Sequence, residues 1–169
     1  MPTVGRHPVL AYGSNACPSK ITWLRTALGL TGPVVVLRVR TEGLAAVWAS
    51  GLRVVDDQRP ATLCAAPGVV EQHALWLATD DQLAVLDVCE GRGVRYDLAL
   101  VRTGRFVLDD GSAVPDPLAY VGRSPARHPL LVDGAPVRCA EVAQDVARQL
   151  IGEPAAGDGL DREVVPLRS

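Results

Sequence analysis

Two segments of the sequence carry residues whose types and spacing suit chemistry, and the first is the turn Tyr12-Gly13-Ser14-Asn15. It follows a short apolar stretch and precedes Pro18, so we expect a strand, a glycine turn and the start of a helix. That arrangement gathers unpaired backbone N–H groups beside the positive end of a helix dipole, where a carboxylate or phosphate can bind. Ser14 and Asn15 are also ordinary turn and N-cap residues, so a purely structural role fits the same pattern.

The second segment ends in Glu90, which follows Leu83 and Leu86 at helical spacing and therefore continues an apolar side of a predicted helix. Glu90 also falls in the last turn, where the negative end of the helix dipole opposes an acidic side chain. Burial and the dipole are both expected to raise its pKa, which suits a carboxyl that passes a proton in both directions near neutral pH. A partly exposed glutamate paired with Arg92 or Arg95 is the alternative.

Helices must position both segments. Pro18 suits the first turn of a helix that ends before Gly29. Thr79 and Gln82 have the spacing of a capping box, and Gly91 can end the helix that carries Glu90. A last helix is predicted within 140–150, with this inward stripe: Ala140, Ala143, Val146, Ala147 and Leu150.

Strand-like patterns cover most of the remaining chain. Strands are predicted over 8–12, 34–49 with an interruption at Gly43, 61–65, 69–77, 96–101, 105–108 and 118–121. Pro67-Gly68 is read as a hairpin turn, and residues 54–60 as an exposed loop. Because the helices do not alternate regularly with the strands, a mixed α+β domain fits better than a doubly wound parallel sheet.

The length of 169 residues suits one domain, which we place at residues 1–154, followed by a tail at 155–169 that is expected to be mobile. The net charge of −2, with arginines scattered among acidic residues, argues against binding to nucleic acid or to an anionic membrane. No signal peptide or membrane-length apolar run is visible, which favours a cytoplasmic protein.

Cysteines and histidines are isolated from one another along the chain. The four cysteines form no C-x-x-C pair, and the three histidines have no partner at helical spacing. These patterns predict neither a metal site nor a disulfide framework.

Taken together, the motifs resemble those of the γ-glutamylcyclotransferase-like proteins. The run Val9-Leu10-Ala11-Tyr12-Gly13-Ser14-Asn15 resembles the N-terminal signature of that family, and Leu86-Asp87-Val88-Cys89-Glu90-Gly91 resembles its second signature. Pro60-Ala61-Thr62-Leu63 and Ala119-Tyr120-Val121 fall where the family has further strands. The resemblance covers roughly residues 8–150.

The resemblance implies a small mixed β-barrel with packed helices and an enzyme that needs no metal or cofactor. Its substrate would be a small γ-glutamyl molecule, whose α-carboxylate the backbone of Gly13, Ser14 and Asn15 would bind. Glu90 would take a proton from the α-amine, which attacks its own γ-carbonyl, and would return the proton to the leaving amine, so that 5-oxoproline and a free amine are released.

Tyr12 belongs to the same turn, and Tyr96 and Tyr120 are further candidates for the pocket, although a tyrosine on a strand is more often a core residue. Cys17 and Pro18 depart from the family pattern and leave the substrate open. The leaving group and the oligomeric state are not specified by the sequence. The main alternative is a non-catalytic module that uses the Gly13-Ser14-Asn15 loop as a carboxylate receptor, and a different amide-cleaving or lyase reaction is a third.

Overall fold

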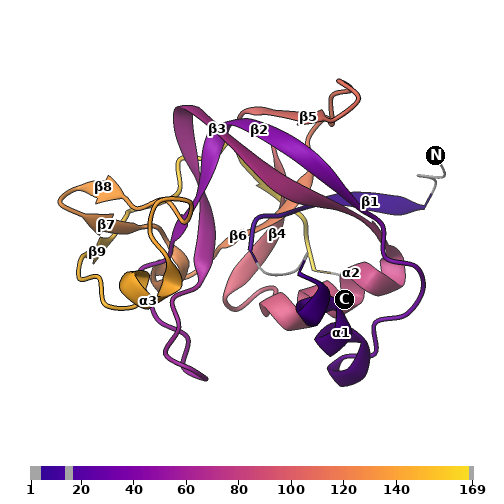
Figure 1. The fold of residues 1–169 in the computed structure, drawn as a ribbon, viewed down its shortest axis with the longest axis horizontal. Coiled ribbons are helices and arrows are strands. Elements are labelled where there is room, and N and C mark those ends of the chain that lie inside the picture. Colours follow the sequence, from indigo (N-terminus) through magenta and orange to yellow (C-terminus); the bar gives the residue numbers. More distant parts are fainter. Residues whose placement is uncertain (1–4, 14–16, 168–169) are drawn as a thin grey trace.

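The computed structural model describes residues 5–13 and 17–167, and it has a mixed α+β architecture (Figure 1). A seven-stranded sheet has the order β10-β4-β6-β1-β3-β2-β5, and a three-stranded sheet has the order β8-β7-β9. Figure 1 shows the small sheet and α3 at the opposite end of the molecule from α1 and α2. Within the described part of the chain, no helix is both long and apolar enough to cross a bilayer.

The elements follow one another closely along the chain. The strands of the large sheet are β1 (Arg6–Ala11), β2 (Val36–Trp48), β3 (Ala61–Thr79), β4 (Tyr96–Val101), β5 (Arg105–Leu108), β6 (Leu118–Gly122) and β10 (Arg162–Val164). The small sheet contains β7 (Leu130–Val132), β8 (Ala135–Pro136) and β9 (Glu153–Pro154). The helices are α1 (Pro18–Ala27), α2 (Asp80–Glu90), α3 (Gln144–Ala147) and the 3-10 turn η2 (Pro125–Arg127).

The large sheet is open, so the barrel implied by the resemblance is not confirmed in residues 5–13 and 17–167. β5 pairs only with β2 and β10 pairs only with β4, and these two short strands form opposite edges. β10 lies in the segment that the sequence assigns to a tail. Its antiparallel pairing with β4 adds a strand that no sequence pattern predicts.

β2 and β3 form one long hairpin, and the predicted turn at Pro67-Gly68 is wrong. β3 continues through these residues because β2 pairs with it on both sides of the irregularity. Glu42 pairs with Val70 and Leu44 with Ala65, so the extra β3 residues bulge opposite Gly43, whose φ is +90°. The predicted interruption at Gly43 is therefore at the right place.

The ends of α2 are as the sequence predicts. Thr79 is the N-cap, and its side chain and that of Gln82 form both hydrogen bonds of a capping box. Gly91 ends the helix in the left-handed conformation, with a φ of 64°, which glycine adopts without steric cost. Pro18 lies in the first turn of α1, also as predicted.

The last predicted helix is mostly absent. α3 contains only Gln144–Ala147, and Ala147 is its one buried residue. Residues 137–139 pair with β2: Trp48 N–H donates to the Val137 carbonyl, and Cys139 N–H donates to the Ala46 carbonyl. A turn follows, in which Glu141 N–H donates to the Arg138 carbonyl, and after α3 the N–H groups of Gln149 and Leu150 donate to carbonyls three residues back, so the i to i−4 bonds of an α-helix are confined to a short segment.

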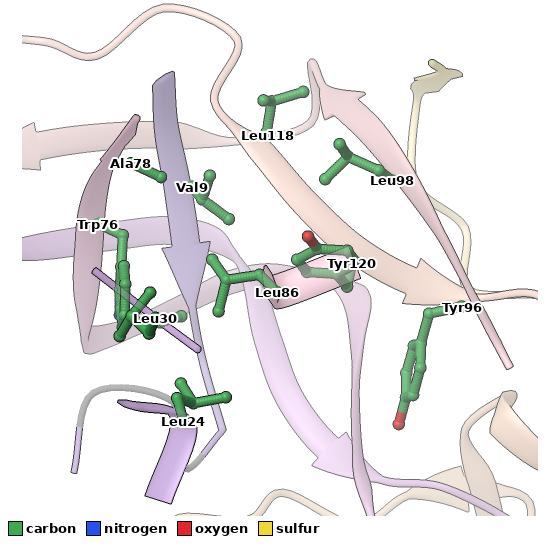
Figure 2. Close-up of a cluster of buried hydrophobic side chains, with 11 residues drawn as sticks. Val9, Leu24, Leu30, Trp76, Ala78, Leu86, Tyr96, Leu98, Leu118 and Tyr120 are labelled. Atoms are coloured by element: carbon green, nitrogen blue, oxygen red, sulfur yellow. The ribbon is translucent and has the colours of Figure 1, made fainter. Parts of the chain in front are cut away.

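A hydrophobic cluster under α1 and α2 holds the helices against the sheet (Figure 2). In Figure 2, Leu86 of α2 lies between Val9 of β1 and Tyr120 of β6, with Trp76 and Leu24 nearby. Each of these five side chains is buried. Burying a large apolar side chain contributes about 1.5–3 kcal/mol, so this cluster fixes α2 and the position of its C-terminal end.

Arg59 ties the loop after β2 to α3, although the sequence places it in an exposed loop. It is 4% exposed, and its guanidinium donates hydrogen bonds to the carbonyls of Ala49, Ser50, Ala147 and Leu150 at 2.7–3.0 Å. The carbonyls that Arg59 binds come from two segments far apart in the sequence, so no local pattern indicates that this side chain is buried.

Replacing Arg59 with glutamine is expected to lower the free energy of unfolding by about 3 kcal/mol, because several buried carbonyls lose their donor. Urea denaturation measures this change. The matched control is Arg38→Gln, whose side chain is 69% exposed and should change stability by less than about 0.5 kcal/mol. Equal effects of the two substitutions would contradict the assigned role.

Glu71 of β3 is the second buried charge that joins distant segments. Its carboxylate accepts hydrogen bonds from the Ala46 N–H, from Arg138 Nε and from the ring of His73, each at 2.9 Å. Burial alone raises the pKa of Glu71, but these three donors together lower it below its usual value.

Glu71→Gln should therefore lower stability by about 2 kcal/mol at neutral pH, because Arg138 loses its buried partner. A depressed pKa stabilises the protein above the unfolded value of about 4.3, and this contribution disappears as the pH falls through the folded pKa. The measurement compares urea unfolding of both proteins from pH 5 downwards. The difference between them should shrink towards acidic pH, and a constant difference would refute the prediction.

Candidate functional site

A cleft of about 540 Å³ lies between α1, the C-terminal end of α2 and the loop that joins β2 to β3. This volume is in the range of small-molecule sites. Aromatic and apolar side chains form much of its wall, including Trp23 and Trp48, while Val54 and Val55 on the loop are almost fully exposed. The cleft is therefore large enough for a ligand somewhat bigger than one amino acid.

Most of the predicted site residues meet in this cleft. Tyr12, Gly13, Glu90, Tyr96 and Tyr120 all line it, although they come from four separate elements and turns. Ser14 and Asn15 lie outside the described residues, so the predicted backbone cradle is represented here by Gly13 alone. The structure thus brings together the candidates that it describes, and their roles in binding or catalysis stay predictions.

Strand pairing and helix length explain why Glu90 reaches the turn after β1. β1 and β3 are antiparallel, with Arg6 opposite Thr79 and Ala11 opposite Ala74. α2 begins directly after Thr79 and returns alongside β1 (Figure 1). It spans about 15 Å at 1.5 Å per residue, and β1 spans about 17 Å, so the two elements end at nearly the same level.

Glu90 is the last residue of α2 and is half-buried at the cleft wall. Of the two arginines expected as its partners in the alternative, Arg92 pairs with Asp87 at 2.8 Å, and Arg95 donates to the Cys89 carbonyl at 3.3 Å. Glu90 lines the same cleft as the three tyrosines, and its charge contributes to raising the pKa of each of them. The predicted rise in its own pKa stays a prediction.

The hydroxyl group of each of the three tyrosines donates a hydrogen bond to another group of the protein. The Tyr12 hydroxyl donates to the Tyr120 carbonyl, the Tyr96 hydroxyl to the Ala61 carbonyl at 2.9 Å, and the Tyr120 hydroxyl to Asp87 at 2.7 Å. Figure 2 shows the Tyr96 hydroxyl directed away from the aliphatic side chains of the core. Tyr96 and Tyr120 are therefore buried core residues that also line the cleft, so both expected locations apply to them.

The electrostatic surroundings keep these phenols protonated. Burial is the main cause that raises the pKa of Tyr12, Tyr96 and Tyr120, and the charge of Glu90 adds to it in each case. For Tyr120, the hydrogen bond to Asp87 raises the pKa further. Neutral phenols donate hydrogen bonds and shape the wall, but they do not act as bases near neutral pH.

Cationic side chains dominate the charge of the cleft, and no sequence pattern predicts this. Among the described residues, five of them line the cleft against the single carboxyl of Glu90, although the whole chain carries a net charge of −2. The five are Lys20, Arg53, Arg59, Arg95 and Arg127. Only the fold assembles them, because they come from distant parts of a chain in which arginines are scattered. A positive cleft attracts an anionic ligand.

Cysteines and metal-binding side chains add no further centre to this site. All four cysteines are free thiols, and burial raises the pKa of Cys139, at the cleft wall, to about 12. Cys17, at the start of α1, is exposed and makes no capping hydrogen bond with its side chain. Among the residues that the structure describes, no three His, Cys, Asp or Glu side chains are grouped closely enough to hold a metal ion.

Comparisons with known proteins find similarity in structure but not in sequence. No protein-family model matches the chain, and no curated protein matches it by sequence. An uncharacterised human protein is similar in structure, with a TM-score of 0.57 and 15% identity over 71% of this chain and 68% of the other. A Kluyveromyces lactis allophanate hydrolase has a TM-score of 0.50 and 10% identity over 84% of this chain and 21% of the other.

A third solved structure is a γ-glutamyl cyclotransferase, with a TM-score of 0.55 and 16% identity over 70% of this chain and 67% of the other. At such low identities the likeness concerns the fold, and a fold by itself does not determine the chemistry. The chain therefore has a γ-glutamyl-cyclotransferase-like fold.

Proposed function

We propose that this protein cleaves a γ-glutamyl amide and releases 5-oxoproline and a free amine, with Glu90 as general acid and base. The observation that carries the proposal is the meeting of Glu90 and Gly13 at one cleft, from two motifs that lie far apart in the sequence. A half-buried carboxyl beside a glycine turn that can offer backbone donors is the arrangement that this reaction needs. The fold shared with a γ-glutamyl cyclotransferase supports the same chemistry.

The reaction uses the substrate as its own nucleophile. The backbone of Gly13, Ser14 and Asn15 binds the α-carboxylate and folds the γ-glutamyl chain so that its α-amine faces its γ-carbonyl. The Glu90 carboxylate takes a proton from the α-amine as the nitrogen bonds to the γ-carbon. The bond from that carbon to the leaving nitrogen then breaks, and protonated Glu90 gives its proton to the departing amine.

The combination of a carboxyl, neutral phenols and several cations limits the chemistry that the cleft can perform. The phenols stay protonated, and burial raises the pKa of Cys139. Among the described side chains of the cleft, Glu90 is therefore the one suited to moving a proton near neutral pH. A reaction whose nucleophile belongs to the substrate requires little more than one such group and a binding site that folds the substrate.

The tyrosines serve to position groups in this proposal and do not transfer protons. Their raised pKa values keep the phenols neutral, and the hydroxyl protons of Tyr96 and Tyr120 are already donated to Ala61 and Asp87. The Tyr120–Asp87 bond continues to Arg92, which joins the strand β6 to the end of α2. This chain of bonds holds the last turn of α2, and with it Glu90, in a fixed place.

Glu90→Gln is expected to lower 5-oxoproline release by at least about 100-fold, because an amide side chain can neither take nor return the proton. Mass spectrometry of a panel of γ-glutamyl compounds measures the product. The thermal unfolding midpoint should stay close to that of the wild-type protein. The matched control is Glu163→Gln, an exposed acid on β10 that should keep full turnover.

Unchanged turnover in the Glu90→Gln protein would refute the assigned role of Glu90. The alternative function, a non-catalytic carboxylate receptor, predicts that γ-glutamyl compounds bind without being cleaved. In that case both the wild-type and the Glu90→Gln protein bind the ligand in calorimetry, and neither forms 5-oxoproline.

A further inference from the structure

Residues 158–167, the C-terminal segment, connect two strands of the large sheet that are not neighbours. At one end, Ala65 N–H of β3 donates to the Asp158 carbonyl at 2.8 Å. β10 then pairs with β4, and Val165 N–H donates to the Leu98 carbonyl of β4 at 2.8 Å. The strands β6 and β1 separate β4 from β3 in the sheet. Backbone bonds therefore fix a segment that the sequence assigns to a mobile tail.

Apolar side chains of the C-terminal segment pack on both sides of the sheet. Leu160 packs against the cluster that contains Leu10, and Val165 packs against the cluster under α1 and α2. Leu167 lies against the loop that follows α2, where a Cβ atom at Gly93 would lie 3.0 Å from Leu167 Cδ1. The C-terminal segment therefore crosses the sheet and reaches the end of α2.

Arg92 joins the C-terminal segment to the last turn of α2. Its Nη1 donates to the Asp87 carboxylate at 2.8 Å, and its Nη2 donates to the carbonyls of Val165 and Pro166 at 3.1 Å and 3.2 Å. The other Asp87 oxygen accepts a hydrogen bond from the Tyr120 hydroxyl at 2.7 Å. The Arg92 side chain is only 12% exposed, so the two halves of one planar fork bind two separate parts of the chain.

The last turn of α2 gains from this contact because its own charges oppose it. Asp87 and Glu90 both lie in this turn, three residues apart, and the turn contains no basic residue. Two acids at that spacing repel each other, and both oppose the negative end of the helix dipole. The guanidinium of Arg92 supplies the missing positive charge, and its bonds to the C-terminal segment anchor that charge to the sheet.

We propose that Arg92 is a positioning residue for Glu90 and that the C-terminal segment completes the candidate site by fixing Arg92. The inference rests on the function proposed above, in which Glu90 transfers the proton. Neither Arg92 nor Asp87 lines the cleft, so Arg92 acts on the reaction through the last turn of α2. A carboxyl that takes and returns a proton depends on its distance to the two substrate nitrogen atoms, so a small displacement of that turn lowers the rate.

Arg92→Lys separates the two contacts of this side chain. Lysine keeps a positive charge beside Asp87, but its single nitrogen cannot span from there to the carbonyls of Val165 and Pro166 as the planar fork does. The kcat for 5-oxoproline release should fall by about 10-fold to 100-fold, while KM stays within about twofold because the substrate contacts are unchanged. The substrate is the compound of the γ-glutamyl panel that the wild-type protein cleaves fastest, and mass spectrometry of the product measures both constants.

Amide hydrogen exchange distinguishes positioning from a general loss of stability. In Arg92→Lys, exchange in residues 86–93 should become faster by at least about 10-fold, while residues 80–85 and β3 keep their wild-type rates. A purely structural role of Arg92 would raise exchange in all of these regions together. Mass spectrometry of peptic peptides from the folded protein measures the rates.

Val165→Pro tests the C-terminal segment without altering the Arg92 side chain. Proline lacks the N–H that bonds to the Leu98 carbonyl, so the substitution loosens the end of the C-terminal segment from β4. The fall in kcat and the faster exchange in residues 86–93 should both recur. Wild-type values of the two in this variant would overturn the role of the C-terminal segment.

The matched control is Arg123→Lys, which should keep the wild-type kcat and exchange. Arg123 also pairs with an acid, Asp97 at 3.0 Å, but its side chain is 53% exposed and it does not line the cleft. When the wild-type protein is active, the inference requires both changes in Arg92→Lys, and either one alone overturns it, as does exchange that rises equally throughout the molecule. If the wild-type protein releases no 5-oxoproline, the proposed function falls, and the exchange of residues 86–93 alone decides whether Arg92 fixes the turn that carries Glu90.

Discussion

The site depends on the antiparallel pairing of β1 with β3 and on the direct passage of β3 into α2. This pairing sets Thr79 opposite Arg6, so α2 starts at one end of β1 and ends near the other. A strand of six residues and a helix of eleven residues have nearly the same length, which brings Glu90 to the level of the glycine turn. A slip of one residue in the β1–β3 register would exchange Val9 and Ala11, which pack under the helices, with Leu10, which packs in the cluster on the other side of the sheet, so the packing of both clusters fixes this register.

Two buried arginines line the cleft and differ in how well the fold satisfies their hydrogen-bond donors. The donors of Arg59 are taken up by carbonyls that converge from the loop after β2 and from α3, and this convergence offsets the cost of burying its charge. The Arg127 guanidinium lacks such acceptors, because its Nε is buried without a hydrogen-bond partner and its Nη1 makes only long contacts. The difference lies in hydrogen-bond partners and not in burial, since both residues are buried.

Short-range features were predictable from the sequence because neighbouring residues determine them. The capping box of Thr79 and Gln82, the left-handed end of α2 at Gly91 and the start of α1 at Pro18 all depend on contacts within one or two turns. The position of Glu90 in the last turn of an amphipathic helix follows from the same local periodicity. The resemblance of two motifs also indicated the fold that the structural comparisons support.

Features that depend on distant partners were decided only by the tertiary structure. β3 runs through Pro67-Gly68 because β2 pairs with it on both sides, and residues 137–139 pair with β2 just before the short helix α3. The sheet stays open in the described part of the chain, and the cations of the cleft come from segments far apart in the sequence. Local patterns cannot reveal such contacts, because the energy of pairing and packing between remote segments outweighs the modest preferences of individual residues.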